Sequence, residues 1–355
     1  MRNFFSAFVV SALLTAPVRA EDAPAPRTPN DIVAAAPAGD WKRIAPSDLL
    51  VMDLAPDAAG KARRVVIQLI PAPFSQGWVG NIRKLVAARW YDGIAVVRVQ
   101  DNYVAQWGDP EGENPQKAKP LPKGLSVVGE NDYVSAIAST IMLSDKEGDP
   151  SKMRANLTFR SGEKLFAKLI SADNDPYADT MIVNGWPAGI GPAAKAASTS
   201  ATNGIPTLLL ERKPLAAAYA WPVHCYGYVG VGRNNSPDTG TGAELYAVIG
   251  HAPRQLDRNV AIVGRVISGI ENLSALPRGT GDIGFYKTPE ERTAIRSIRM
   301  GNEVTGLPVY EYLSSESRSF AAYVDKRANR QDDFYIHPAG GVDVCNVPVP
   351  IREVK

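Results

Sequence analysis

Short apolar runs separated by turn-forming residues divide most of this chain, and this pattern constrains its fold more than any other feature. Residues 64–70 (RVVIQLI) are rich in β-branched side chains and end at Pro71-Ala72-Pro73, as a strand followed by a turn does. We expect further strands at 94–99, 103–107, 155–160, 164–170, 226–231, 244–249, 260–266 and 295–300. Many short strands with only two or three helices favour an antiparallel barrel or sandwich.

Helical spacing of apolar residues is confined to a few segments. One helix is expected from Ser75, as N-cap, to about Arg89, and a short one from Ser268 to Leu276. Residues 310–329 also have helical spacing, whereas 330–355 look irregular. Residues 134–143 fit either a helix or a strand.

The first twenty residues have the pattern of a secretory signal. Arg2 precedes an apolar run over residues 4–15, and Val18-Arg19-Ala20 places small residues at the two positions that a signal peptidase reads. The run is short for a membrane span, and an uncleaved anchor is the alternative. We expect export, most simply to a bacterial periplasm, with no stable membrane insertion after cleavage.

The length of 355 residues allows two domains or one domain with large insertions. Residues 21–40 are rich in Ala and Pro and read as a flexible leader, and residues 110–125 form a polar, Pro-rich loop. Basic and acidic side chains number 39 and 37, a net charge of +2. This near balance argues against a nucleic-acid partner bound by neutralising many phosphates.

Common catalytic and cofactor motifs are missing from the sequence. The three histidines, His224, His251 and His337, have no metal-ligand spacing, and we expect ordinary surface or hydrogen-bonding roles for them. The sequence has no phosphate-binding loop and no G-x-S-x-G motif. Cys225 and Cys345 could pair in an oxidising compartment or remain two buried thiols. No cofactor or metal is expected.

Residues 64–110 show an ordered series of motifs that resembles the first half of a cyclophilin-type peptidylprolyl isomerase. After the strand and the Pro-Ala-Pro turn come 81–85 (NIRKL), 91–93 (YDG), 97–99 (VRV) and 103–110 (YVAQWGDP). The family pattern is N-F-x-x-L, Y-[DY]-G, F-H-R-V and F-M-x-Q-G-G-D-P in the same order. The order of the matches is more specific than any single one.

The second half of the family pattern follows after a long gap. Residues 233–239 (RNNSPDT) resemble the A-N-x-G-P-N-T loop, and 244–246 (ELY) fall where the family has Q-F-F. Residues 256–266 and 270–273 are similar to the next strand and short helix. The resemblance implies a mainly β fold, a closed antiparallel cyclophilin-like barrel capped by two helices. It also implies domain limits of 41–300 with an insertion at about 111–225, and a C-terminal extension at 301–355.

The resemblance also implies site residues. Arg98 falls on the family's essential arginine, and Gln106 on the glutamine that would hold the arginine and the substrate backbone. Asn234 matches a residue whose backbone grips the peptide. The implied pocket positions are Tyr103 for a Phe, Val104 for a Met, Glu244 for the Gln of Q-F-F, Tyr246 for a Phe and Val260 for a His. The implied partners are proline-containing polypeptides, and the sequence leaves the oligomeric state open.

The departures from the family pattern keep other interpretations open. Arg98 could form an ion pair, for instance with Glu244, and Gln106 could be a polar barrel residue. Tyr103 and Tyr246 suit a core as well as a pocket, and Asn234 could stabilise a turn. The functional alternatives are a cyclophilin-like peptide-binding module with little or no catalysis, and an envelope scaffold that uses the insertion and the tail.

Overall fold

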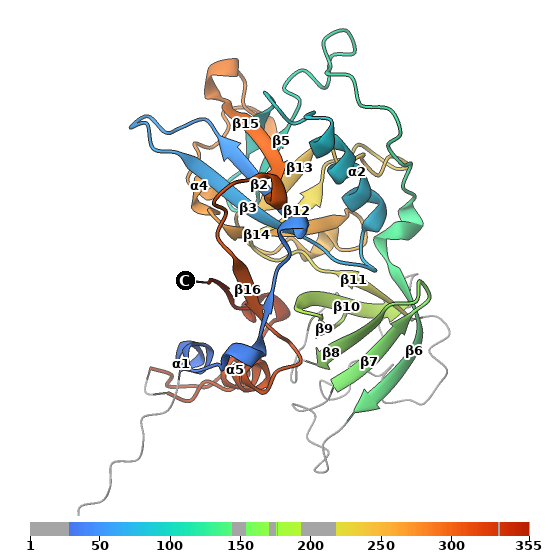
Figure 1. Cartoon of the computed structure of the whole chain (residues 1–355), viewed down its shortest axis with the longest axis vertical. Coiled ribbons are helices and arrows are strands. Elements are labelled where there is room, and N and C mark those ends of the chain that lie inside the picture. Colours follow the sequence, from blue (N-terminus) through green and yellow to red (C-terminus); the bar gives the residue numbers. More distant parts are fainter. Residues whose placement is uncertain are drawn as a thin grey trace, which may run out of the picture.

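The fold is taken from a computed structural model that describes residues 28–143, 154–169, 175, 177–192, 218–332 and 334–354. The expected signal peptide and the first part of the leader lie outside these residues. Figure 1 shows two barrels, with the eight-stranded one above the six-stranded one and α1 beside α5 at the lower left. No helix within these residues is long and apolar enough to cross a membrane.

The larger barrel is closed and antiparallel, in the order β12-β13-β5-β4-β15-β2-β3-β14. Its strands are β2 (Leu49–Leu54), β3 (Arg63–Leu69), β4 (Ala95–Val99), β5 (Val104–Gly108), β12 (Tyr228–Val231), β13 (Leu245–Val248), β14 (Ile262–Ser268) and β15 (Thr293–Met300). Strands from both sides of the long gap therefore complete one barrel. The expected mainly β fold, with a closed antiparallel barrel, is confirmed.

Helices α2 (Gln76–Ala87) and α4 (Glu271–Ser274) pack against this barrel. α2 buries one apolar face that includes Trp78, Ile82 and Leu85, as an amphipathic surface helix does. Ser75 precedes α2 as expected, but it has φ 54° and its hydroxyl makes no capping hydrogen bond. The prediction that Ser268 caps the short helix is wrong. Ser268 ends β14, Gly269 with φ 80° follows it, and Ile270 is the N-cap of α4.

The chain between β5 and β12 forms a second closed barrel, in the order β10-β11-β6-β7-β8-β9. Its strands are β6 (Ser135–Leu143), β7 (Arg154–Phe159), β8 (Lys164–Leu169), β9 (Asp179–Val183), β10 (Trp186–Pro192) and β11 (Ala218–Pro222). The expected hairpin at 155–170 is confirmed as β7 and β8, and the ambiguous segment 134–143 is a strand.

The two barrels share a continuous buried core. The rings of Phe74 and Phe159 meet edge to face at 5.9 Å. Arg265 of β14 is buried, donates to the carbonyl of Gly185 at 2.8 Å and lies 4.3 Å from the Trp186 ring centroid. The six-stranded barrel is thus packed firmly against its neighbour.

The two ends of the described chain meet in a small sheet. β1 (Trp41–Arg43), β16 (Tyr310–Leu313) and β17 (Ile351–Glu353) pair in the order β1-β16-β17, and α1 (Pro29–Ala34) packs on α5 (Arg318–Ala328). The described part of the leader is therefore helical, with a reciprocal cap between Thr28 and Asp31. The segment predicted as helix at 310–329 begins instead as β16. Cys225 and Cys345 form a disulfide.

Candidate functional site

A cavity of about 430 Å³ opens on the larger barrel, between strands β4, β5, β12 and β13 and their loops. Of the predicted site residues it is lined by Arg98, Tyr103, Val104, Gln106, Asn234, Tyr246 and Val260. Residues that were not singled out also line it, namely Val231, Gly232, Arg233, Asn235 and Leu256. Glu244 is the one predicted site residue that does not line the cavity.

The β4–β5 hairpin brings Arg98 and Gln106 together. The two residues are cross-strand partners, and the register shifts between Val96 and Arg98. Such a bulge turns side chains out of the regular alternation. As a result the guanidinium of Arg98 reaches the side chain of Gln106, and its Nη1 donates to Oε1 at 3.0 Å.

The Arg98 guanidinium is held on several sides. Its Nε donates to the carbonyl of Ile283 at 2.8 Å, and its Nη2 donates to the side chain of Gln100. The rings of Tyr103 and Phe285 lie 5.5 and 5.3 Å from it. Burial lowers the pKa of Arg98, and the neighbouring Tyr103 and Glu244 act in the opposite direction. An arginine stays charged under such a shift, so a fixed positive charge stands at the cavity.

Glu244 lies behind the cavity, where it accepts a hydrogen bond from Nε2 of Gln106. Gln106 therefore stands between Arg98 and Glu244, and no direct ion pair joins these two residues. A side chain at Gly232 would place its Cβ 2.8 Å from the Cγ of Glu244, so the glycine provides the space that this carboxylate occupies. Burial raises the pKa of Glu244, and the hydrogen bond from Gln106 lowers it less strongly.

The apolar wall of the cavity is a small cluster of its own. Val104, Tyr246 and Val248 are buried together, with Tyr103 and Val260 packed against them. The Tyr246 ring occupies the space beside Gly230, where an added Cβ would lie 2.3 Å from Cζ and from the hydroxyl oxygen. This wall can receive a compact apolar ring such as that of proline.

The loop at 232–244, which carries Asn234, is fixed to α2 and to the start of the insertion. Trp78 donates to the carbonyls of Thr239 and Gly240 at 3.0 Å, and the Thr239 hydroxyl donates to the carbonyl of Val128 at 2.6 Å. The backbone N–H of Asn234 donates to Asp238 at 2.8 Å. Asn234 thus lies at the cavity in a loop that is held by internal hydrogen bonds. Its expected backbone contact with a peptide stays a prediction.

A comparison with known families identifies this arrangement. The model of the family described as cyclophilin type peptidyl-prolyl cis-trans isomerase/CLD matches residues 59–300, more than half of the chain. The chain belongs to this cyclophilin family. The enzyme class predicted from the motifs, peptidylprolyl isomerase, is confirmed at the level of the family. A comparison with curated proteins found no match.

One solved structure supports the same fold. Cyclophilin AquaCyp293 from Hirschia baltica has a TM-score of 0.54 at 18% sequence identity, covering 89% of this chain and 97% of that chain. A cyclophilin type peptidyl-prolyl cis-trans isomerase from Cryptosporidium parvum has a TM-score of 0.33 at 11% identity, covering 71% of this chain and 97% of that chain. The Cryptosporidium protein has also been solved in the presence of the dipeptide Ala-Pro. The similarity to AquaCyp293 shows that this chain has a cyclophilin fold.

Besides the five unpredicted residues that line the cavity, the site has two contacts to Arg98 that no sequence motif indicates. Ile283 and Phe285 touch Arg98 from a loop almost 200 positions further along the chain, and these two residues are 62% and 40% exposed. Ile283 has φ 46° and ψ 27°, a left-handed conformation that a β-branched residue rarely adopts. Only exposed apolar residues between glycines could have drawn attention to this loop.

Proposed function

We propose that this cyclophilin accelerates cis-trans isomerisation of X–Pro bonds in exported polypeptides, with Arg98 polarising the prolyl amide. The observation that carries the proposal is the guanidinium of Arg98 at an apolar cavity. It is oriented by Gln106, Gln100 and the carbonyl of Ile283, and no ion pair to a described carboxylate engages it. Its charge is therefore available to a ligand.

Isomerisation of an X–Pro bond requires only a site whose shape fits the twisted amide and a hydrogen-bond donor positioned at the prolyl nitrogen. An X–Pro amide has partial double-bond character and isomerises in tens of seconds or more without a catalyst. A site accelerates the reaction if it binds the twisted amide better than either planar form. The proline ring would lie against Val104, Tyr246 and Val260. The guanidinium would donate to the prolyl nitrogen, whose lone pair becomes available as resonance is lost. No covalent intermediate is formed.

A proline-limited refolding assay tests this role in the chain without residues 1–20. We expect Arg98→Ala to lower kcat/KM about a hundredfold or more, as the loss of one preorganised donor does. Arg64→Ala is the matched control, because Arg64 lies on β3 in a surface ion pair with Asp53 and should leave activity unchanged. No acceleration by the wild type, with peptide binding still measurable, would reject the isomerase in favour of a binding module.

Export is supported by the signal-like pattern of residues 1–20 and by the disulfide between the only two cysteines, Cys225 and Cys345, because disulfides persist in oxidising compartments. Expression of the full chain in a Gram-negative bacterium tests the point. We expect the protein in the periplasmic fraction, with a mature N-terminus at Glu21. A full-length protein in the cytoplasm would contradict export, and a full-length protein in the membrane would indicate an uncleaved anchor.

A further inference from the structure

The hydroxyl of Tyr246 is hydrogen-bonded to a histidine that is buried beneath the cavity. The side chain of His224 has no exposed surface, and its Nε2 lies 2.7 Å from the Tyr246 hydroxyl. The two rings are nearly parallel, with an interplanar angle of 10°. The ring of Tyr246 thus faces the cavity while its hydroxyl is anchored inside the protein.

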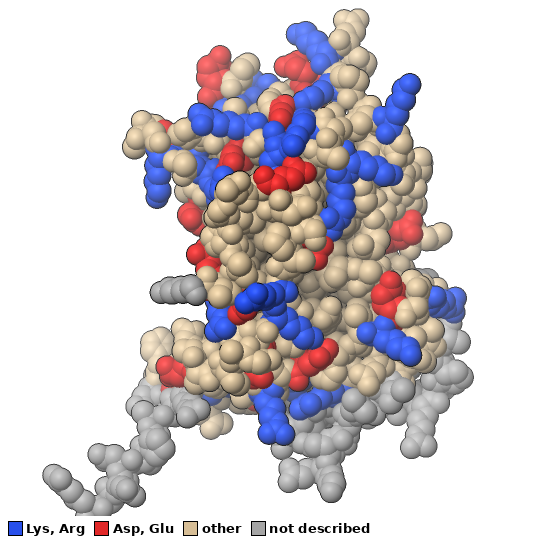
Figure 2. Space-filling view, in the orientation of Figure 1, with Lys and Arg blue, Asp and Glu red and all other residues tan. Residues whose placement is uncertain are grey.

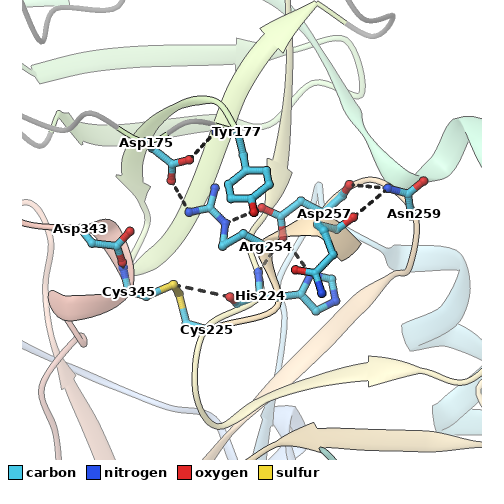
Figure 3. Close-up of polar contacts among 10 residues, drawn as sticks. Asp175, Tyr177, His224, Cys225, Arg254, Asp257, Asn259, Asp343 and Cys345 are labelled. Atoms are coloured by element: carbon cyan, nitrogen blue, oxygen red, sulfur yellow. Dashed lines mark hydrogen bonds and ion pairs between the residues drawn. A yellow bond between two sulfur atoms is a disulfide. The ribbon is translucent and has the colours of Figure 1, made fainter. Parts of the chain in front are cut away.

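The chain of polar contacts continues from His224 toward the six-stranded barrel (Figure 3). Nδ1 of His224 lies 2.9 Å from Oδ1 of Asp257, and Nε of Arg254 donates to Oδ2 of Asp257 at 2.6 Å. Nη1 of Arg254 then forms an ion pair with Asp175, which lies in the connection between β8 and β9. The Tyr177 ring lies 5.6 Å from the Arg254 guanidinium.

Burial makes each link of this chain depend on the next. The side chains of Arg254, Asp257 and Asp175 are only 5%, 4% and 1% exposed. Removing one member of a buried ion pair leaves its partner charged and unpaired, which is costly, so the remaining groups move to recover partners. A carboxylate only accepts hydrogen bonds. Nδ1 of His224 therefore carries the hydrogen of its contact with Asp257, and this contact fixes the orientation of the ring beside the Tyr246 hydroxyl.

We propose that His224 is a positioning residue for the cavity, and that Asp175 acts through Arg254, Asp257 and His224 to fix the ring of Tyr246. The six-stranded barrel thereby sets how tightly the cavity holds a proline side chain. This inference rests on the proposed function for the identity of the ligand. The close approach of the Tyr246 ring to Gly230 supports it, because the ring fills the space that a side chain there would take and its position depends on the anchored hydroxyl.

A double-mutant cycle tests the proposal in the chain without residues 1–20, with a tetrapeptide that contains one Ala-Pro bond as the probe. We expect Asp175→Asn to weaken binding about threefold to tenfold. In a Tyr246→Phe background, which lacks the anchored hydroxyl, the same substitution should change binding by less than about twofold. An equal factor in both backgrounds, or no effect in either, would overturn the inference.

Glu163→Gln is the matched control, because Glu163 lies in the turn between β7 and β8 of the same barrel and its carboxylate accepts a hydrogen bond from Ser161, not from Arg254. It should leave binding unchanged. If Asp175→Asn does not fold, Arg254→Lys replaces it in the cycle, because an ammonium keeps the charge but not the planar fork that joins both carboxylates.

Nitrogen chemical shifts of the His224 ring give a readout that is independent of peptide. We expect Asp175→Asn to shift Nδ1 and Nε2, and Glu163→Gln to leave both unchanged. Unmoved resonances would overturn the coupling even if binding changed. If the wild type bound no peptide, the proposed function would fail, and the ring shifts alone would then decide whether Asp175 is coupled to Tyr246.

Discussion

Glu244 shows how one residue can keep a place in a family motif and change its role. It stands where the family has glutamine, and its side chain contacts Gln106 behind the cavity instead of lining it. The sequence could place it near the site because the motif around it is ordered. The position of its side chain behind the cavity depends on the space left by Gly232. Gly232 is more than ten residues away along the chain, so no local sequence pattern reveals that space.

The raised pKa of Glu244 predicts a pH-dependent cost in stability. Burial favours the protonated form in the folded state. Below the pKa of Glu244 in the unfolded chain, the residue is protonated in both states and does not reduce the stability of the fold. As pH rises through the raised pKa of the folded state, part of the stability is lost, because the unfolded chain releases its proton more readily. We expect Glu244→Gln to match the wild-type Tm below about pH 4 and to exceed it at neutral pH. Thermal melts across this range measure the difference.

The matched control for Glu244→Gln is Glu303→Gln, because Glu303 is partly exposed and forms an ion pair with Arg89. Removing a surface ion pair lowers stability by about 0 to 1 kcal/mol, which is opposite in sign to the change expected for Glu244→Gln at neutral pH. A Glu244→Gln variant that was no more stable than the wild type at neutral pH would contradict the burial argument.

At the scale of elements, the sequence predicted those strands whose pattern is local. The run at 64–70 and the hairpin at 155–170 are β3, β7 and β8, because β-branched residues and a tight turn specify them without help from distant segments. The segment 310–329 shows the limit of periodicity. Its first residues pair with β1 as β16, since a distant strand overrides a helical pattern over so few residues.

The site residues likewise fall into those that local motifs predict and those that only the folded barrel brings together. Arg98, Gln106 and Tyr246 could be predicted because they lie in ordered motifs on adjacent strands β4, β5 and β13. Ile283 and Phe285 could not, because a loop just before β15 brings them to Arg98 only when the barrel closes. For His224 the sequence predicts an ordinary surface or hydrogen-bonding role. The residue is fully buried and hydrogen-bonded, and its partners come from segments that share no motif with it.

At the scale of the molecule, closure of two barrels on one core explains why a long insertion is tolerated inside a cyclophilin barrel. The six-stranded barrel satisfies its own strand edges through the pairing of β6 with β11, and closure leaves no edge exposed. On the face shown in Figure 2, basic and acidic side chains are interspersed over both barrels. This mixture fits a ligand recognised through an apolar cavity better than a charged polymer.

The disulfide between Cys225 and Cys345 joins the connection from β11 to β12 with the C-terminal segment, across a sequence separation of 120 residues. Closing so long a loop restricts the unfolded chain, and a native disulfide of this kind contributes about 2 to 4 kcal/mol. We expect the double variant Cys225→Ala, Cys345→Ala to lose stability by that amount in urea unfolding. The two single variants control for the reactivity of a lone thiol. Equal unfolding midpoints for the oxidised wild type and the double variant would show that the small sheet β1-β16-β17 and α5 hold the C-terminal segment without the bond.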